Sequence, residues 1–178
     1  MSEPFSRVVR VDSIPRDGQT LDIEASPRER EALAALYKLP SIEALSAELT
    51  LRRSAGGDVN VTGTVHGRLN QICVVSLEPF PATVDEEIDV RFAPLTKEAA
   101  QRRLSEEPVT FSIADEDEPD PIIDGKIDIG ALAAEFFTLG LDPYPRKPGV
   151  AFEPPDDEAE ADKVSPFSAL RDRTGNRD

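Results

Sequence analysis

Few residues of this 178-residue chain are of the types that carry out catalysis or bind metals. It has a single histidine, His66, and a single cysteine, Cys73. These counts leave no multi-histidine metal site, no intramolecular disulfide and no four-thiolate metal site within the chain. The sequence also lacks a glycine-rich phosphate loop, an HExxH helix and a nucleophile elbow. We therefore expect a protein that is not an enzyme and that has no cofactor and no bound metal.

The neighbours of His66 and Cys73 favour structural roles for both. His66 lies in an alternating run whose apolar face holds Val65 and Gly67, so its side chain should lie on the opposite, exposed face. We expect a surface or hydrogen-bonded histidine rather than a catalytic base. Cys73 lies in an apolar run without a flanking cation, an environment that keeps a thiol inert. We expect a buried structural cysteine rather than a redox or metal-binding one.

Carboxylates are abundant, but they gather in runs that should be solvated. The chain has 35 Asp and Glu against 20 Lys and Arg, a formal net charge of −15. Residues 115–178 hold 17 acidic and 7 basic residues, chiefly in the acidic runs 115–120 and 153–162. Such acidity argues against non-specific adhesion to nucleic acid. The runs either keep the chain soluble or form arms that bind a basic protein.

Basic residues occur in pairs that could contact RNA or a protein partner. The three pairs are Arg52 and Arg53 at the end of a strand, Arg102 and Arg103 at the end of a helix, and Arg146 and Lys147 among prolines. Further arginines near the N-terminus are Arg7, Arg10 and Arg16. If such residues converge, a local positive face on an acidic molecule would permit selective RNA contact. The alternative is that they are scattered, solubilising cations.

Alternation of apolar and polar residues, together with β-forming composition, predicts most of the strands. The predicted strands cover residues 5–11, 21–25, 45–52, 59–69, 72–77, 84–92 and 109–113. A turn signal at 15–18 suggests that the first two pair as a hairpin. Gly63 and Gly67 lie on the apolar face of their strand, which suggests a bulge or a close approach of another backbone.

Helix signals occur at three places before the C-terminal tail. Ser26, Pro27 and Glu29 match a capping box for a helix that ends before residue 40, with Leu33, Leu36 and Tyr37 on one face. Thr96 could cap a short helix that extends to residue 104. Asp128 should cap a helix over residues 129–139 that ends at Gly140 and whose apolar stripe is Ile129, Leu132, Phe136 and Leu139.

These elements predict an α+β fold, with a mainly antiparallel sheet or small open barrel, three or so flanking helices and a flexible acidic C-terminal tail. We expect one domain over residues 1–150, a disordered acidic linker over 151–164 and a short amphipathic segment over 165–178. No apolar stretch approaches a membrane span, and the N-terminus lacks a secretory signal. A cytoplasmic protein is therefore expected.

The order of several motifs resembles a known bacterial family. The motifs are GTV at 63–65, QICVVSLEPF at 71–80, IDGKIDIG at 123–130, Glu135, LGLDPYP at 139–145 and SPFSAL at 165–170. Together they resemble the YceD family, the large ribosomal RNA subunit accumulation proteins, in its alphaproteobacterial form. The resemblance covers about residues 5–172. Many members carry a Cys-x-x-Cys motif, and the matching positions here are Cys73 and Ser76, followed by Leu77, Glu78 and Pro79.

Because Ser76 replaces the second thiol, the pair that a metal or disulfide role of that motif would need is missing, and we expect the segment to be structural. The resemblance implies a non-enzymatic factor for the synthesis, processing or stability of 23S rRNA, and so for large-subunit assembly. Its expected partners are basic ribosomal proteins or assembly factors, or rRNA contacted through a local basic face. The charge balance favours the protein partners, and neither DNA nor a membrane is expected. The alternative is an acidic protein-interaction adaptor unconnected with ribosomes.

Overall fold

The structure of the chain is a computed structural model that describes residues 4–94 and 119–152. The chain divides into two compact units, residues 1–147 and 148–178. All helices and strands named below belong to the first unit, and residues 148–152 of the second form no helix or strand. No helix in the described ranges is long and apolar enough to cross a membrane.

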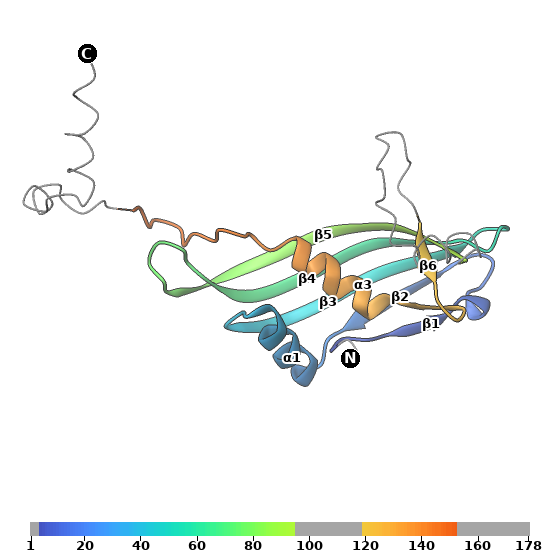
Figure 1. Cartoon of the computed structure of the whole chain (residues 1–178), viewed down its shortest axis with the longest axis horizontal. Helices are drawn as coiled ribbons and strands as arrows, with labels where there is room; N and C mark the ends of the chain where they lie inside the picture. Colours follow the sequence, from blue (N-terminus) through green and yellow to red (C-terminus); the bar gives the residue numbers. More distant parts are fainter. Residues whose placement is uncertain (1–3, 95–118, 153–178) are drawn as a thin grey trace, which may run out of the picture. The chain divides into compact units, whose positions relative to one another are not determined.

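A five-stranded open sheet is the centre of the first unit (Figure 1). Its strands, in spatial order, are β2 (Gln19–Glu24), β3 (Ser41–Arg53), β4 (Val59–Ile72), β5 (Pro79–Pro94) and β6 (Asp120–Ile122). Neighbours are antiparallel except β5 and β6, which are parallel over three residues. Buried and exposed residues alternate along the long strands, as the sequence pattern predicts. The α+β class and the mainly antiparallel sheet are therefore confirmed.

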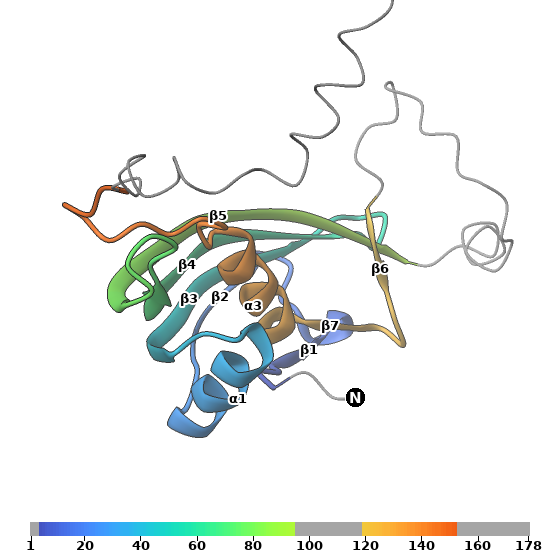
Figure 2. The same ribbon diagram turned by 60° about the vertical axis from the view of Figure 1, so that its left-hand side comes forward.

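The remaining elements cover one face of this sheet (Figure 2). They are helices α1 (Pro27–Tyr37) and α3 (Ile129–Leu139), a 3-10 turn η1 (Val11–Ser13), and an antiparallel pair formed by β1 (Val8–Arg10) and β7 (Lys126–Asp128). The described residues contain two α-helices, where the sequence predicts about three. The predicted helix at 96–104, the predicted strand at 109–113 and the acidic tail lie outside the described residues.

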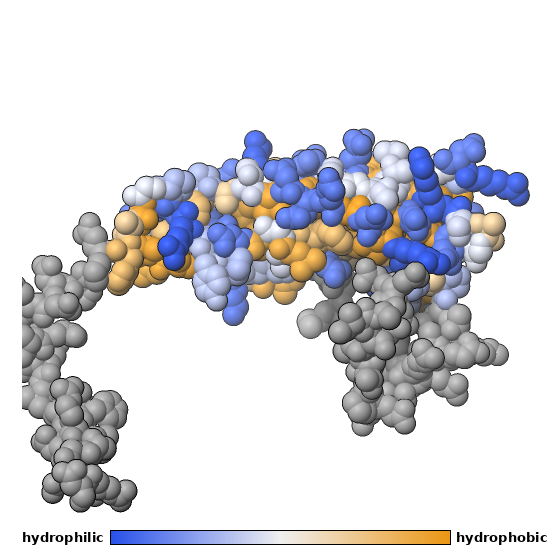
Figure 3. Space-filling view, turned by 90° about the horizontal axis from the view of Figure 1, so that it is seen from above, coloured by the Kyte–Doolittle hydropathy of each residue, from blue (hydrophilic) through white to orange (hydrophobic). Residues whose placement is uncertain are grey.

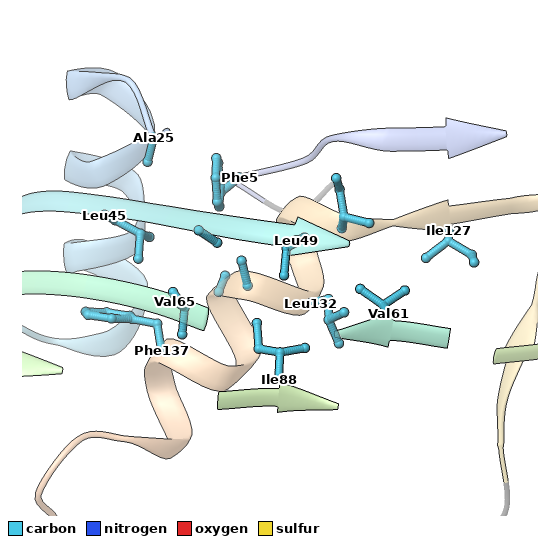
Figure 4. Close-up of a cluster of buried hydrophobic side chains, with 14 of the residues drawn as sticks. Phe5, Ala25, Leu45, Leu49, Val61, Val65, Ile88, Ile127, Leu132 and Phe137 are labelled. Atoms are coloured by element: carbon cyan, nitrogen blue, oxygen red, sulfur yellow. The ribbon is translucent and has the colours of Figure 1, made fainter. Parts of the chain in front are cut away.

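The core lies between the sheet and the elements that cover it, and α3 supplies many of its side chains (Figure 4). Leu132 and Phe137 of α3 are buried against inward-facing residues of the long strands, among them Val65 and Ile88. Gly67 makes this packing possible, because a Cβ there would lie 2.3 Å from the Phe137 ring. The close approach of another backbone that the sequence predicts is present at Gly63, where a Cβ would collide with the backbone carbonyl of Glu48, whereas the neighbour of Gly67 is the Phe137 ring. The only register shift in the β3–β4 pair lies between Ile42 and Ala44, so the bulge predicted at the glycines is wrong.

The capping box predicted at the start of α1 is present. The Ser26 side chain accepts a hydrogen bond from the Glu29 backbone N–H, and the Glu29 carboxylate accepts one from the Ser26 N–H at 2.8 Å. Arg7 donates from both terminal nitrogens to the same carboxylate, at 2.7 and 3.0 Å. This hydrogen bonding lowers the pKa of Glu29 to about 2. The helix ends at Tyr37, and Lys38 takes a left-handed conformation before residue 40.

Two strand predictions are wrong. The N-terminal strand does not form a hairpin with β2, because β1 pairs with β7 and β2 pairs with β3. Contacts distant in sequence hold it there: the Arg7 N–H donates to the Asp128 carboxylate at 2.7 Å, and the Ile129 N–H donates to the Arg7 carbonyl. The apolar run at 72–77 is a turn beyond Ile72, the last residue of β4. Leu77 has a φ of 60° there, a left-handed conformation that is incompatible with a strand.

The buried faces of both helices also differ in part from those predicted. Leu36 of α1 is 55% exposed, and the buried residues of that helix are Leu33 and Ala34. Leu139 of α3 is 72% exposed, whereas Phe137, which the predicted stripe omits, is fully buried. Helical periodicity alone does not show where a helix stops contacting its sheet, so terminal apolar residues are the ones most easily misplaced.

Candidate functional site

Four arginines meet at one end of the sheet, and we call them the arginine end: Arg16, Arg52, Arg53 and Arg91. Arg52 and Arg53 close β3, as the sequence predicts. The register pairs Arg52 with Asn60 of β4, and Asn60 with Arg91 of β5. These three exposed residues therefore form one cross-strand row on the outer face of the sheet, the face away from the helices.

Surface depressions surround the arginine end. One, of about 550 Å³, is lined by Arg52, Arg53, Ser54, Asp58, Asn60, Thr62 and Arg91. A second, of about 520 Å³, brings Arg16 of the turn before β2 next to Arg53 and Ser54. Arg53 also lines a third, beside Gly57 and residues 122–125. In the view of Figure 3, strongly hydrophilic side chains gather towards this end of the unit.

Only part of this positive charge is neutralised by neighbouring carboxylates. Asp58, in the β3–β4 turn, accepts from Arg91 Nη2 at 2.6 Å and from Arg91 Nε at 3.1 Å. Within residues 4–94 and 119–152, no ion pair involves Arg16, Arg52 or Arg53. Guanidinium groups stay charged at every physiological pH and donate in pairs to oxyanions. The arrangement can therefore bind an anionic group without any change of protonation.

The outer face changes charge within a short distance of the arginine row. The next row along the strands holds Thr20, Thr50, Thr62 and Asp89, and the following one Asp22, Glu48, Thr64 and Glu87. Successive rows are about 7 Å apart, because each is two residues further along the strands. The two rows next to the arginine row thus carry three glutamate or aspartate side chains and a fourth in Asp89, and neither row contains a basic residue.

The other predicted basic pairs do not join the arginine end. Arg146 and Lys147 lie beside the β4–β5 turn, at the opposite end of β4, which has 14 residues and is about 45 Å long. Lys147 Nζ donates to Glu78 at 2.8 Å, a contact that raises the pKa of Lys147 and lowers the pKa of Glu78. Arg102 and Arg103 lie outside the described residues. Of the three predicted pairs, the structure assigns only Arg52 and Arg53 to this site.

Cys73 begins the β4–β5 turn, and its thiol is surrounded by donors. The backbone N–H groups of Val75, Ser76 and Lys147 point at Sγ, with N···S distances of 3.4, 3.4 and 3.3 Å. The side chain is fully buried, as predicted. Hydrogen bonding from Ser76 is the main cause that lowers the pKa of Cys73, to about 6, with the Lys147 N–H contributing and burial opposing. The family-motif positions Leu77, Glu78 and Pro79 complete the turn and start β5.

His66 lies on the outer face in the middle of β4, as predicted, with 55% of its side chain exposed. Its Nδ1 is 2.6 Å from Asp85 Oδ1 and its Nε2 is 3.2 Å from Thr64 Oγ1. Both ring nitrogens therefore have partners from the same face of the sheet. Within the described ranges, no group of three or more His, Cys, Asp or Glu side chains is placed to hold a metal ion.

Arg91 is the site residue that sequence reasoning missed. Arg91 lies 39 positions after Arg52 and has no basic residue beside it in the sequence, so the local sequence does not mark it as part of a basic site. The register of the two β-hairpins carries the signal, because pairing Arg52 with Asn60 and Asn60 with its partner on β5 brings Arg91 into the row.

Comparison with known proteins identifies the chain at the level of its family. No curated protein and no solved structure has significant similarity to it. The model of the family described as large ribosomal RNA subunit accumulation protein YceD matches residues 61–172, which include all but the first two residues of β4, together with β5, β6, β7 and α3. That range is more than half of the chain and contains Arg91, the Cys73 turn and α3, whereas Arg16, Arg52 and Arg53 precede it. The chain belongs to the YceD family of large ribosomal RNA subunit accumulation proteins.

Proposed function

We propose that this protein supports the accumulation of 23S rRNA, and so the assembly of the large ribosomal subunit, as a binding factor and not as an enzyme. The observation that carries the proposal is the family match over residues 61–172. Such a factor works in the cytoplasm, where bacterial subunits assemble. Binding could act on the synthesis, processing or stability of the rRNA, since each of these changes how much of it accumulates.

The chemistry of the described surface favours binding over catalysis. The arginine end offers permanent charges that cannot donate or accept a proton at neutral pH. His66, the single histidine of the chain, lies on an open sheet face and is already hydrogen-bonded through both ring nitrogens.

The assembling subunit offers two classes of partner to such a factor. Basic ribosomal proteins or other assembly factors would meet the acidic parts of the chain, which has a net charge of −15. The outer face contributes to this acidity through Asp22, Glu48 and Glu87. The second class is rRNA itself, which would bind to a basic face of the protein. Neither contact needs a cofactor or a metal.

A deletion strain tests the proposal. We expect loss of the gene to lower 23S rRNA relative to 16S rRNA and to reduce the 50S peak in sucrose gradients, and we expect the full chain supplied from a plasmid to restore both. The matched control is a plasmid that carries a stop codon early in the same gene. Normal 23S levels and a normal gradient in the deletion strain would remove the proposal and leave an acidic adaptor unconnected with ribosomes as the function.

A further inference from the structure

We propose that the arginine end of the sheet binds the phosphate backbone of RNA. The choice of RNA as the polyanion rests on the proposed function, whereas the anion site itself rests on geometry. Arg52 and Arg91 lie in one row of the sheet, and Arg53 lines the depressions on both sides of the strand end, one of which it shares with Arg16.

The groups around these arginines fit phosphate and sugar oxygens. A guanidinium donates two parallel N–H bonds to a phosphate, and hydroxyl and amide groups supply further donors. The depression of about 550 Å³ provides both kinds, with Ser54, Asn60 and Thr62 beside its three arginines. Its one carboxylate, that of Asp58, is already bonded to Arg91 and so opposes an incoming anion less than a free carboxylate would.

The residues that line this depression also indicate how RNA would be read. None of its lining residues is aromatic, so it has no platform on which a base could stack. Arginine contacts to phosphates position a nucleic acid without reading its sequence. The arginine end would therefore bind backbone, and any selectivity for one rRNA segment would come from the shape of the RNA or from another partner.

The acidic rows restrict the direction in which RNA can cross the sheet. Asp89 lies one row, about 7 Å, from the arginine row, whereas Glu48 and Glu87 lie about 14 Å from it, beyond the screening length of about 8 Å at physiological salt. A phosphate bound at the arginine row is thus largely screened from Glu48 and Glu87, whereas a backbone that ran along β4 would pass between these two carboxylates. The RNA backbone would therefore follow the arginine row across the strands at the end of the sheet, and would not run along the strands over the middle of the outer face.

The test is a salt titration of binding between the full chain and a transcribed domain of 23S rRNA. Each phosphate contact contributes about 0.7–0.9 to the slope of log affinity against log salt. We expect Arg52→Ala/Arg53→Ala to weaken binding about tenfold or more at low salt and to reduce the slope by about 2. Arg16→Ala alone should reduce it by about 1.

The matched control removes the same charge elsewhere. Arg68 is exposed in the middle of β4, and Arg146 lies beside the opposite turn. The variant Arg68→Ala/Arg146→Ala should keep the wild-type slope. An equal loss in both double variants would mean that net charge alone controls binding, and it would overturn the proposal. Absence of wild-type binding to the rRNA domain at 50 mM salt would overturn it as well.

A second titration, with polyglutamate in place of RNA, separates a phosphate site from a site for an acidic protein. If Arg52→Ala/Arg53→Ala weakens polyglutamate binding and leaves RNA binding unchanged, the assignment to RNA is wrong. The deletion strain separates this inference from the proposed function. Lowered 23S rRNA in the strain together with unchanged RNA binding by the double variant would overturn the arginine site alone.

Discussion

At the scale of single residues, Cys73 shows how backbone geometry sets the character of a side chain. Burial in apolar surroundings by itself raises the pKa of a thiol, because it disfavours the charged form. Here the Ser76 hydroxyl and three backbone N–H groups act in the opposite sense and dominate. One of these N–H groups belongs to Lys147, which is 74 positions away in the sequence. The local sequence, with no cation beside the cysteine, could not reveal this environment.

We expect the Cys73 thiol to titrate near pH 6 in the folded protein, against an ordinary value near 9. The chain has one cysteine, so thiolate absorbance at 240 nm reports this residue alone. Ser76→Ala should move the midpoint upwards, because it removes the largest cause of the shift. Since folding lowers this pKa, the thiolate stabilises the folded state fully above about pH 9, and this contribution is lost as the pH falls towards 6. A folded-state midpoint at or above 9 would contradict the geometry of the turn.

At the scale of elements, the contact between α3 and the sheet depends on the missing side chain of Gly67. Gly67→Ala would place a Cβ 2.3 Å from one Phe137 ring carbon and 2.6 Å from another, so the ring or the helix must move. We expect the free energy of unfolding to fall by about 1–3 kcal/mol in urea denaturation. Gly56→Ala, in the open β3–β4 turn, should change it by less than about 0.5 kcal/mol. Equal effects of the two substitutions would contradict the packing described.

The Arg7–Glu29 contact connects the N-terminal segment to the start of α1, and its strength should depend on pH. We expect Glu29→Gln to lower the free energy of unfolding by about 1–2 kcal/mol at pH 7, through loss of the ion pair and part of the cap. Folding lowers the pKa of Glu29 from 4.5 to about 2, so its contribution is complete above about pH 4.5 and disappears as the pH falls towards 2.

The pH dependence separates this contact from general effects of helix charge. The difference between wild type and Glu29→Gln, measured by urea denaturation, should shrink between pH 4.5 and 2. Glu31→Gln, an exposed change in the same helix, should differ from wild type by less than about 0.5 kcal/mol at pH 7. If the difference in free energy of unfolding between wild type and Glu29→Gln stays constant down to pH 2, the carboxylate charge does not contribute to stability.

The accuracy of the strand and helix predictions depended on whether an element is defined by local pattern or by distant partners. Period-two alternation predicted β3, β4 and β5, and a capping box predicted α1, because each pattern is complete within the element. The β1–β7 pair joins residues more than 110 positions apart, so no local pattern predicts it. Hydrophobicity alone predicts a strand for the apolar turn after β4, because it does not show the left-handed conformation of Leu77.

At the scale of the whole molecule, the positions of the charged residues say more about possible binding surfaces than the net charge does. The sequence contains Arg52 and Arg53 as a visible pair, but their association with Arg16 and Arg91 follows only from the sheet. The same topology separates Arg146 and Lys147 from them by the length of β4. The sequence therefore suggests a local basic face on a chain with a net charge of −15. Identifying the residues of that face requires the strand register.

The outer-face carboxylates Glu48 and Glu87 should limit how tightly RNA binds at the arginine end. If they restrict RNA to the end of the sheet, Glu48→Gln/Glu87→Gln should raise affinity for the rRNA domain by about two- to fivefold at 50 mM salt, with the gain shrinking as added salt screens the charges. Glu31→Gln/Glu135→Gln changes the net charge equally but alters exposed residues of α1 and α3, on the other side of the sheet. This control should raise affinity much less, since its charges lie far from the arginine row. If the two double variants gain equally, RNA responds to the total charge of the molecule and its path across the sheet is not restricted by these carboxylates.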